Sequence, residues 1–303
     1  MRIFVTGASG FVGSAVVQDL LRAGHQVTGL ARSDAAARAI AAAGAAVHRG
    51  NLEDAESLRA GAAAAEGVIH TGFNHDFSRF AENCELDRRV IATLGAGLAG
   101  SDRPLVVTSG VALLPHGQLA TEDMAPTGRH PRVASEEAAR AVADRGVRVS
   151  IVRLPPTVHG DGDHGFVPLL ISLAREKGVA AYVADGANHW SAVHRLDAAP
   201  VYRLALERAG AGATYHAVAE EGVPFRRIAE AIGRGLRLPV ESRTIEQAAA
   251  HFGWFAHFAS MDVPTSSART RRALGWSPSG PDLATDLAGP GYFAAPKEAV
   301  TPP

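Results

Sequence analysis

The most constraining feature of this sequence is a glycine-rich segment near its amino terminus. Gly7, Gly10 and Gly13 lie between a short apolar run at 3–6 and an amphipathic stretch at 11–23. In such a layout the first glycine permits a tight turn, the second lets backbone approach a pyrophosphate, and the third lets a helix pack closely on a strand. The helix N-terminus then offers unpaired N–H groups to phosphates. The segment therefore predicts a dinucleotide-binding turn between a strand and a helix, rather than a turn without a ligand.

Apolar runs and helical stretches alternate through the first half of the chain. Strands are expected at 3–6, 26–31, 45–48, 67–70, 104–108 and 147–154, and helices at 11–23, 35–43, 86–98 and 135–144. This alternation predicts βαβ units and an α/β fold, a Rossmann doubly wound parallel sheet. The later pattern is less regular, with a helix expected at 167–176 and a strand followed by a helix over 192–206.

The less regular part of the chain is expected to form a second, smaller unit. We predict a Rossmann domain of residues 1–155 and 191–218, and a small C-terminal substrate-binding lobe of residues 156–190 and 219–303. The tail from 296 to 303 is polar and contains proline, and it is expected to be loose.

Composition excludes several classes of function. The 303 residues are 47% hydrophobic and 20% charged, which is ordinary for a globular protein. A formal net charge of −1 gives no overall field for nucleic acid or anionic lipid. The single cysteine, Cys84, excludes an intramolecular disulfide and a zinc cluster. Neither a signal peptide nor an apolar run long enough to span a bilayer is recognised. We therefore expect a cytoplasmic protein with no nucleic-acid or membrane partner.

The end of the second expected strand bears on the choice of cofactor. An NAD site usually places an acid there, whereas an NADP site places a cation near the 2′-phosphate. Here Arg32 could pair with that phosphate and Ser33 could donate to it, unless Arg32 is simply a solvated cation. The nearby acid, Asp34, falls where a helix N-cap is expected. The pattern favours NADP(H), with NAD(H) as the alternative.

Other cofactor contacts are expected where the remaining strands end, because ligands of such sheets bind at the carboxyl ends of the strands. Asn51 and Leu52 follow the third strand and are expected beside the adenine, and 71–73 follow the fourth strand. The predicted cofactor-binding residues are Gly7, Ser9, Gly10, Phe11, Val12, Gly13, Arg32, Ser33, Asn51, Leu52, Thr71, Gly72, Phe73, Thr108, Leu154, Pro155, Pro156, Thr157 and Val158.

Four segments together resemble the extended short-chain dehydrogenase/reductases, the NAD-dependent epimerase/dehydratase-like family. Residues 6–13 match the family's T-G-x-x-G-x-x-G, and 152–160 resemble its R-x-x-x-v-Y-G segment at the nicotinamide, with His159 replacing the Tyr. Residues 192–199 are similar to its v-H-v-x-D-x-A segment, and 268–278 to its C-terminal L-G-W-x-P element. The resemblance covers nearly the whole chain and implies the fold and a bound nucleotide, but no particular substrate.

The family's catalytic Y-x-x-x-K motif is missing. None of the tyrosines, at 182, 202, 215 and 292, is followed four residues later by lysine. Our alignment puts Arg132 at the position of the Tyr and Glu136 at that of the Lys. Residues spaced by four are neighbours on a helix, so we expect these two to form an ion pair. The chain thus resembles an atypical member that keeps the nucleotide site and lacks the standard acid.

Other groups must then supply the chemistry. Thr108 and Ser109 match the family's Ser/Thr position at the end of the fifth strand, where Ser109 could hydrogen-bond a substrate carbonyl or merely cap a turn. Histidine is the natural second choice of acid near neutral pH, and His159 lies after the sixth strand; other loop histidines or a water are alternatives. The predicted catalytic residues are Ser109, Thr108 and His159. The polar loop 160–165 lacks the ligand set of a Ca²⁺ or Zn²⁺ site, so no metal is expected.

The substrate site is expected to be aromatic and apolar with few polar groups, as small-molecule sites are. The predicted substrate-binding residues are His75, Phe77, Val111, His164, Phe166, Trp190 and Trp254. These features predict NADPH-dependent reduction of a C=O, C=C or C=N bond in a hydrophobic small molecule. The alternatives are an epimerase or dehydratase and a redox-inert NADP-binding regulator. The resemblance also suggests a homodimer formed through the helices after the fourth and fifth strands.

Overall fold

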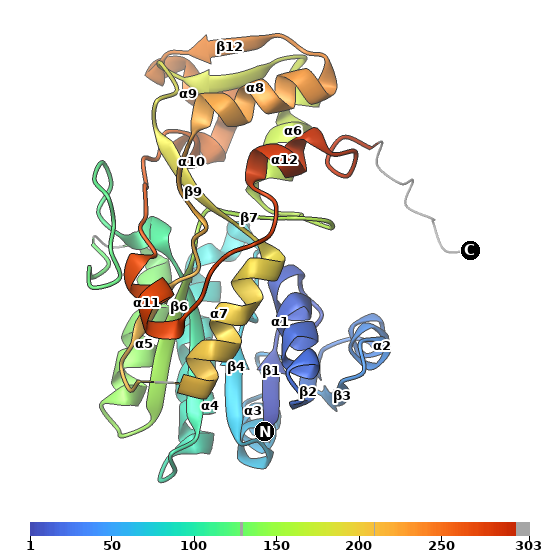
Figure 1. The fold of residues 1–303 in the computed structure, drawn as a ribbon, viewed down its shortest axis with the longest axis vertical. Coiled ribbons are helices and arrows are strands. Elements are labelled where there is room, and N and C mark those ends of the chain that lie inside the picture. Colours follow the sequence, from blue (N-terminus) through green and yellow to red (C-terminus); the bar gives the residue numbers. More distant parts are fainter. Residues whose placement is uncertain (128–129, 209, 295–303) are drawn as a thin grey trace.

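The computed structural model describes residues 1–127, 130–208 and 210–294, so the tail expected to be loose lies outside the described part. Figure 1 shows two lobes arranged along the long axis of the molecule, with the amino terminus in the larger one. The strand β9 runs between them, and α12 and α11 near the carboxyl end lie against the small and the large lobe respectively.

The larger lobe is built on a seven-stranded sheet with the order β10-β6-β5-β4-β1-β2-β3. All neighbouring strands in it are parallel. Its strands are β1 (Arg2–Thr6), β2 (Gln26–Ala31), β3 (Ala46–Arg49), β4 (Gly67–His70), β5 (Pro104–Gly110), β6 (Arg148–Leu154) and β10 (Thr214–His216). The strand order reverses between β1 and β4, and ligands of doubly wound sheets bind outside the carboxyl ends at such a switch point. The predicted Rossmann fold is confirmed.

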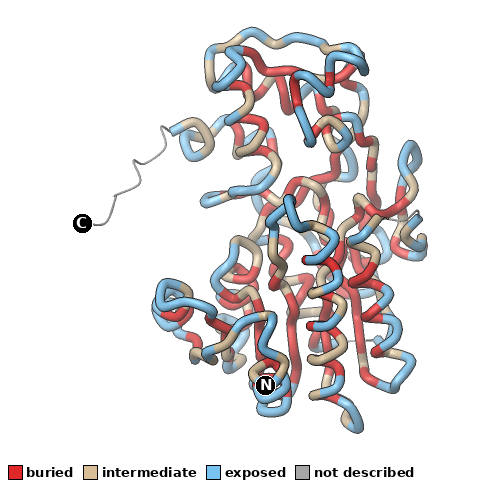
Figure 2. The backbone as a smooth tube through the Cα atoms, turned by 180° about the vertical axis from the view of Figure 1, so that it is seen from behind, coloured by how far each residue is buried: buried red, intermediate tan, exposed pale blue. Residues whose placement is uncertain are grey.

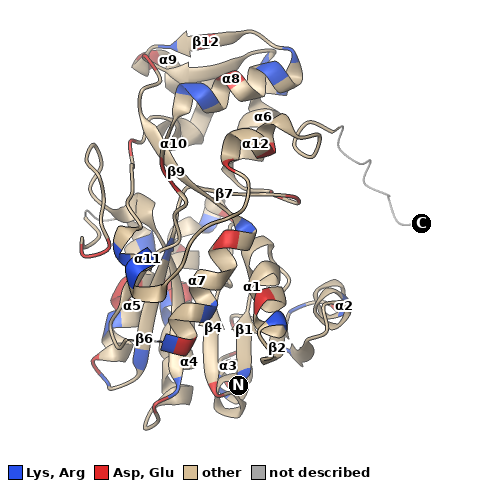
Figure 3. Cartoon of the chain, viewed as in Figure 1, with Lys and Arg blue, Asp and Glu red and all other residues tan. Residues whose placement is uncertain are grey.

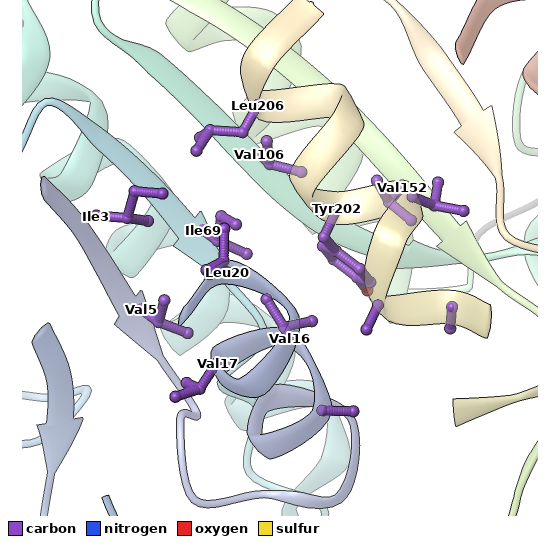
Figure 4. Close-up of a cluster of buried hydrophobic side chains, with 14 of the residues drawn as sticks. Ile3, Val5, Val16, Val17, Leu20, Ile69, Val106, Val152, Tyr202 and Leu206 are labelled. Carbon is purple, nitrogen blue, oxygen red and sulfur yellow. The ribbon is translucent and has the colours of Figure 1, made fainter. Parts of the chain in front are cut away.

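Helices cover both faces of this sheet because successive strand residues point to opposite sides. Ile3 and Val5 of β1 pack with α1 (Phe11–Arg22) and α7 (Arg195–Arg208), as Figure 4 shows. The helix α2 (Asp34–Ala42) belongs to the same core. Phe4, between them, packs on the other side with α3 (Ala55–Ala64), α4 (Phe80–Leu98) and α5 (Ala134–Ala143).

The smaller lobe has its own core. Trp190, Phe225, Phe252 and Phe255 are buried there, and the buried stretches run through both lobes in Figure 2. Its sheets have the orders β11-β9-β7 and β12-β8. The strands are β7 (Thr157–His159), β8 (Ala180–Val183), β9 (His189–His194), β11 (Glu220–Pro224) and β12 (Val240–Arg243), and the helices are α6 (Phe166–Lys177), α8 (Phe225–Leu236), α9 (Ile245–Phe252), α10 (Ala256–Ala259) and α12 (Leu283–Ala288). Short 3₁₀ turns are η1 (Phe77–Arg79), η2 (Val111–Leu113), η3 (Pro131–Val133) and η4 (Gly253–Phe255).

Several parts of the structure differ from the sequence-based expectation, among them α3, where no helix was expected. The helix after β4 begins at Phe80 rather than 86, since the turn η1 leads directly into it. The helix α11 (Ala268–Leu274) falls in the stretch expected for the small lobe, yet Leu274 and Trp276 pack in the core of the large lobe beside Tyr202. The chain therefore returns to the large lobe before it ends.

The surface has a mixed charge. In the view of Figure 3, basic and acidic residues are interspersed over both lobes. Among the described residues, no helix combines the length and the apolar character that crossing a membrane requires.

Candidate active site

The glycine turn after β1 can be formed only by this sequence of glycines. Gly7 has φ +69°, and a Cβ there would lie 2.7 Å from the backbone nitrogen of Gly72. A Cβ on Gly13 would lie 2.0 Å from the carbonyl oxygen of Gly7. Gly10 is the N-cap of α1, no side chain caps this end, and the first turn holds no acid. The free N–H groups of α1 therefore suit the phosphates of a dinucleotide.

A partly buried arginine lies beside this turn. The Arg195 guanidinium lies 4.6 Å from the centre of the Phe11 ring and donates to Ser14 Oγ at 2.8 Å. Its Nε is buried without a hydrogen-bond partner in the described chain. Because an orphaned cationic N–H is costly, this atom is suited to an anionic ligand at the turn. The sequence analysis missed Arg195, whose only signal was its place directly after a strand. His164, predicted for the substrate, packs instead edge-on to Phe11 at 5.8 Å.

At the end of β2, one expectation is wrong. The N-cap of α2 is Ser33, whose Oγ accepts from the Ala36 N–H at 3.2 Å. Asp34 is the first helical residue, and its carboxylate pairs with Arg49 at 2.8 Å. Arg32 is exposed and has no polar partner within the described residues. Its charge and the hydroxyl proton of Ser33 are thus both available to a phosphate.

The turns after β3 and β4 are fixed by side chains. Asn51 Oδ1 accepts from the backbone nitrogens of Glu53 and Asp54, at 2.8 and 3.0 Å, which leaves its amide group free to donate. The Thr71 hydroxyl donates to the Thr6 carbonyl at 2.8 Å. Such bonds hold the carboxyl ends of β1 and β4 together where the strand order reverses.

Arg132, at the aligned Tyr position, belongs to a buried polar chain. Its NH1 donates to Asp87 Oδ2 at 2.6 Å, and His70 Nε2 lies 2.9 Å from Asp87 Oδ1. Since a carboxylate only accepts, His70 donates from Nε2, and its Nδ1 lies 2.6 Å from the Thr6 hydroxyl. Burial alone would raise the pKa of Asp87, but the Arg132 charge and the His70 and Ser135 hydrogen bonds hold that pKa well below its usual range.

The expected ion pair between Arg132 and Glu136 is wrong. Arg132 lies in the 3₁₀ turn η3, which directly precedes α5, and it pairs with Asp87. Glu136 is fully buried and binds Arg153 of β6 through both carboxylate oxygens, at 2.7 and 2.8 Å. Burial would raise the pKa of Glu136, yet the hydrogen bonds from Arg153 and Ser109 and the Arg153 charge lower it.

The two hydroxyls at the end of β5 face inward. Ser109 Oγ is buried and donates to Glu136 Oε1 at 2.8 Å. Thr108 Oγ1 donates to the His70 carbonyl at 2.7 Å and lies 3.0 Å from the Tyr202 hydroxyl. Each hydroxyl proton is thus already used inside the protein, which leaves Ser109 and Thr108 able to accept from a ligand but not to donate.

His159 lies apart from these residues. It is fully buried, its Nδ1 lies 2.5 Å from Asp286 Oδ2 on α12, and its ring packs against His194 at 5.5 Å. Burial lowers the pKa of His159, although the hydrogen bond to Asp286 opposes that shift. These contacts join β7 to β9 and α12 within the small lobe. Among the described contacts of His159, none is to Ser109 or Thr108.

Three of the predicted substrate residues do gather beyond the end of β4. The Phe73 ring centre lies 4.0 Å from the Arg132 guanidinium carbon and 5.0 Å from the His75 ring. Phe77 stacks on Trp254 of the small lobe at 4.8 Å. On its other side Phe77 stacks on Phe80 at 5.5 Å, a residue that the sequence analysis missed. We call Phe73, Phe77, Phe80 and Trp254 the aromatic cluster.

The other predicted substrate residues are structural. Phe166 and Trp190 pack against each other at 5.9 Å in the small-lobe core, and Val111 is fully buried. A groove of about 550 Å³ opens elsewhere, beside α1 and α7, and no predicted site residue lines it. The candidate site is therefore the edge between the glycine turn and the aromatic cluster.

Comparison with known proteins identifies the family and agrees with the fold. The model of the NAD dependent epimerase/dehydratase family matches residues 3–219. An uncharacterized protein of Schizosaccharomyces pombe is 52% identical over 97% of this chain and 100% of its own length. A 4-hydroxy-2-methyl-3-oxo-4-farnesyl-3,4-dihydroquinoline-1-oxide ketoreductase of Stigmatella aurantiaca is 29% identical over 84% of this chain and 80% of its own length. The Thermus thermophilus UDP-glucose 4-epimerase, solved with NAD, shares the fold with a TM-score of 0.73 at 22% identity, over 96% of this chain and 100% of that one.

Proposed function

Because this chain belongs to the NAD-dependent epimerase/dehydratase family, we propose that it is an oxidoreductase that uses NADPH to reduce a C=O, C=C or C=N bond of a hydrophobic small molecule, a carbonyl first among them. The observation that carries the proposal is the aromatic cluster beside the nucleotide turn. Phe77 and Trp254 stack across the two lobes there, and Arg132 and His75 are the polar groups in contact with Phe73.

The cofactor would be held by the chain's own fixed groups. The N-terminus of α1 would bind the pyrophosphate, and Arg195, which lies over the Phe11 ring at the start of that helix, would add a positive charge. Arg32, unpaired in the described chain, would bind the 2′-phosphate, which supports NADPH over NADH. When bound, the nicotinamide supplies the hydride.

The aromatic cluster would hold the apolar part of the substrate, which would cover the exposed rings of Phe77 and Trp254. Apolar sites with few polar groups bind hydrophobic ligands and orient them through those few groups. The ketoreductase of Stigmatella aurantiaca, named for its reaction on a ketone, supports carbonyl reduction over the other bond types.

The proton for the product requires a donor other than tyrosine. The Ser109 proton is donated to Glu136 and is not available to a substrate. His75 packs on Phe73 within the site. Burial, followed by the charges of Arg132 and His164, lowers the pKa of His75, so its ring is neutral near pH 7. We infer that His75, or a water bound to it, passes a proton from solvent to the substrate oxygen.

Deuterium transfer tests the proposal. The protein is incubated with 4-deuterated NADPH, each stereoisomer in turn, and a panel of aryl ketones, enones and cyclic imines, and the products are read by mass spectrometry. Label in a product alcohol is the expected result. Tight NADPH binding with no label in any product would overturn the reductase and favour the isomerase or the regulator.

A further inference from the structure

Arg132 brings a permanent positive charge to the aromatic cluster. It lies over the face of Phe73, at 4.0 Å from the ring centre, and its side chain is 16% exposed. The neighbouring rings of the cluster, Phe77, Phe80 and Trp254, carry no charge and no hydrogen-bond acceptor. A ligand that enters this cluster therefore meets one cation in apolar surroundings.

The guanidinium keeps N–H groups for a ligand. Of its five donors, NH1 is used by Asp87 and Ser135, and NH2 makes a long contact of 3.4 Å to the Thr108 carbonyl. Nε forms no hydrogen bond with the described residues. The bonds at NH1 fix the plane of the group, so the remaining N–H groups are oriented before a ligand arrives.

Asp87 does not cancel this charge. Its carboxylate is shared among three donors, since His70 and Ser135 bind it as well as Arg132. Burial is the main cause of the lowered pKa of His75, and the Arg132 charge is the next, ahead of the opposing effect of Asp87. The pKa of His130 is also lowered, first by burial, then by His257 and Arg132. The Arg132 charge thus contributes to lowering the pKa of both rings, after burial.

We propose that Arg132 is an anion-binding residue, and that this site takes an amphipathic ligand whose carboxylate binds Arg132 while its apolar part packs on the aromatic cluster. That this ligand is the substrate, and so also carries the carbonyl to be reduced, rests on the proposed function. The binding site itself does not. A carboxylate accepts two N–H bonds from a guanidinium, and charge-assisted bonds of this kind are strong where water is excluded. A tyrosine at this position could not provide that charge.

Binding of two matched ligands tests the proposal without any turnover. The probes are 3-phenylpropanoate and its neutral amide, titrated calorimetrically into the full chain with and without saturating NADP⁺. We expect the acid to bind wild type at least about tenfold more tightly than the amide, the size of one charge-assisted contact. Arg132→Gln should remove this preference and leave amide binding unchanged, and Arg132→Lys should restore part of it. Arg271→Gln is the matched control, because Arg271 also lies over an aromatic ring, Trp276, but on α11.

Several results would overturn the proposal. Equal affinity of acid and amide for wild type would do so, and so would an acid preference that persists in Arg132→Gln. Should that variant fail to fold, Arg132→Lys decides, because the ammonium keeps the charge but lacks the planar fork, so the acid preference should fall without disappearing; an unchanged preference in Arg132→Lys would overturn the proposal. If the acid is not preferred but deuterium is transferred to a product, the reductase proposal stands without the anion site. If the acid is preferred but no deuterium is transferred, the anion site stands without the proposed reaction.

Discussion

The Ser109 hydroxyl donates to Glu136 Oε1 across 2.8 Å, and this bond decides what the serine at the end of β5 can do. A serine offered to a substrate carbonyl must donate its single proton to the carbonyl oxygen. Here that proton points into the protein, toward a carboxylate that Arg153 also holds. Glu136, at the aligned Lys position, thus takes the proton that Ser109 would otherwise donate to a substrate.

Ser109→Ala should affect stability more than catalysis. A lost hydrogen bond to a charged group costs about 1.5–3 kcal/mol of unfolding free energy. The expected fall in kcat/KM is less than about tenfold, or roughly 1.4 kcal/mol, because the hydroxyl does not donate to the substrate. Urea unfolding and steady-state kinetics on the labelled product measure both effects. A fall in kcat/KM of a hundredfold or more, with stability unchanged, would restore Ser109 as a substrate contact.

Glu136→Gln should be strongly destabilising. The change leaves the fully buried Arg153 without a counter-charge, and breaking a buried ion pair costs about 3–5 kcal/mol. The matched control is Glu137→Gln on the same helix, where the carboxylate is exposed and pairs with Arg88 at the surface. That variant should lose less than about 1 kcal/mol. Thermal and urea unfolding of the two variants compare them, and similar losses would show that the buried pair contributes no more than a surface pair.

Arg32→Ala should separate the two nicotinamide cofactors. Loss of a charge-assisted contact to the 2′-phosphate is expected to weaken NADPH binding about tenfold or more, or roughly 1.4 kcal/mol. NADH lacks that phosphate, so its affinity should not change. Arg22→Ala is the control, since Arg22 is an exposed arginine at the other end of α1. Fluorescence titration measures the affinity of wild type and of both variants for each cofactor, and equal loss for both cofactors in Arg32→Ala would mean that Arg32 does not read the phosphate.

The large lobe was predictable because its signals are local. Each strand and its following helix are contiguous in sequence, and the glycine turn at Gly7 to Gly13 joins neighbouring elements. The small lobe has few such signals. Its short strands pair across long separations, as β12 does with β8, and most of its helices after α8 are brief.

The candidate site shows the same division. Residues of the nucleotide turn could be assigned from spacing alone. The partner of Arg132 could not, since Asp87 lies 45 residues earlier in the chain, and the helical rule suggested Glu136 instead. The burial of His159 depends on Asp286, 127 residues away, and no pattern near His159 indicates it. Side-chain roles at the site are therefore set by tertiary contacts that periodicity does not encode.

Trp254→Ala should weaken substrate binding with little effect on folding. The indole is 55% exposed, so its loss should cost only about 0.5–1.5 kcal/mol of stability, the value of its stacking on Phe77. KM for an apolar ketone should rise roughly tenfold, since about 1.4 kcal/mol of apolar contact is lost. Ile245→Ala is the control, because Ile245 is 73% exposed on α9 of the same lobe. Unchanged KM in Trp254→Ala would place the substrate elsewhere.

Acid should destabilise the protein through His216. This ring is fully buried between Arg153, at 3.3 Å from Nε2, and the Ser266 carbonyl, to which Nδ1 donates at 2.8 Å. Burial lowers the pKa of His216 to about 4, with the Arg153 charge acting in the same direction and Glu122 and Glu136 opposing it.

Between pH 6.5 and about 4 the unfolded chain protonates this histidine while the folded protein keeps it neutral. The unfolded state therefore binds more protons, and the free energy of unfolding falls as the pH decreases through this window, by up to roughly 3 kcal/mol from this group. Urea unfolding at pH 7.0, 6.0 and 5.0 measures the slope for wild type, for His216→Gln and for the exposed control His257→Gln. His216→Gln should flatten the slope by close to one proton, and a slope equal to that of wild type would show that His216 does not titrate with folding.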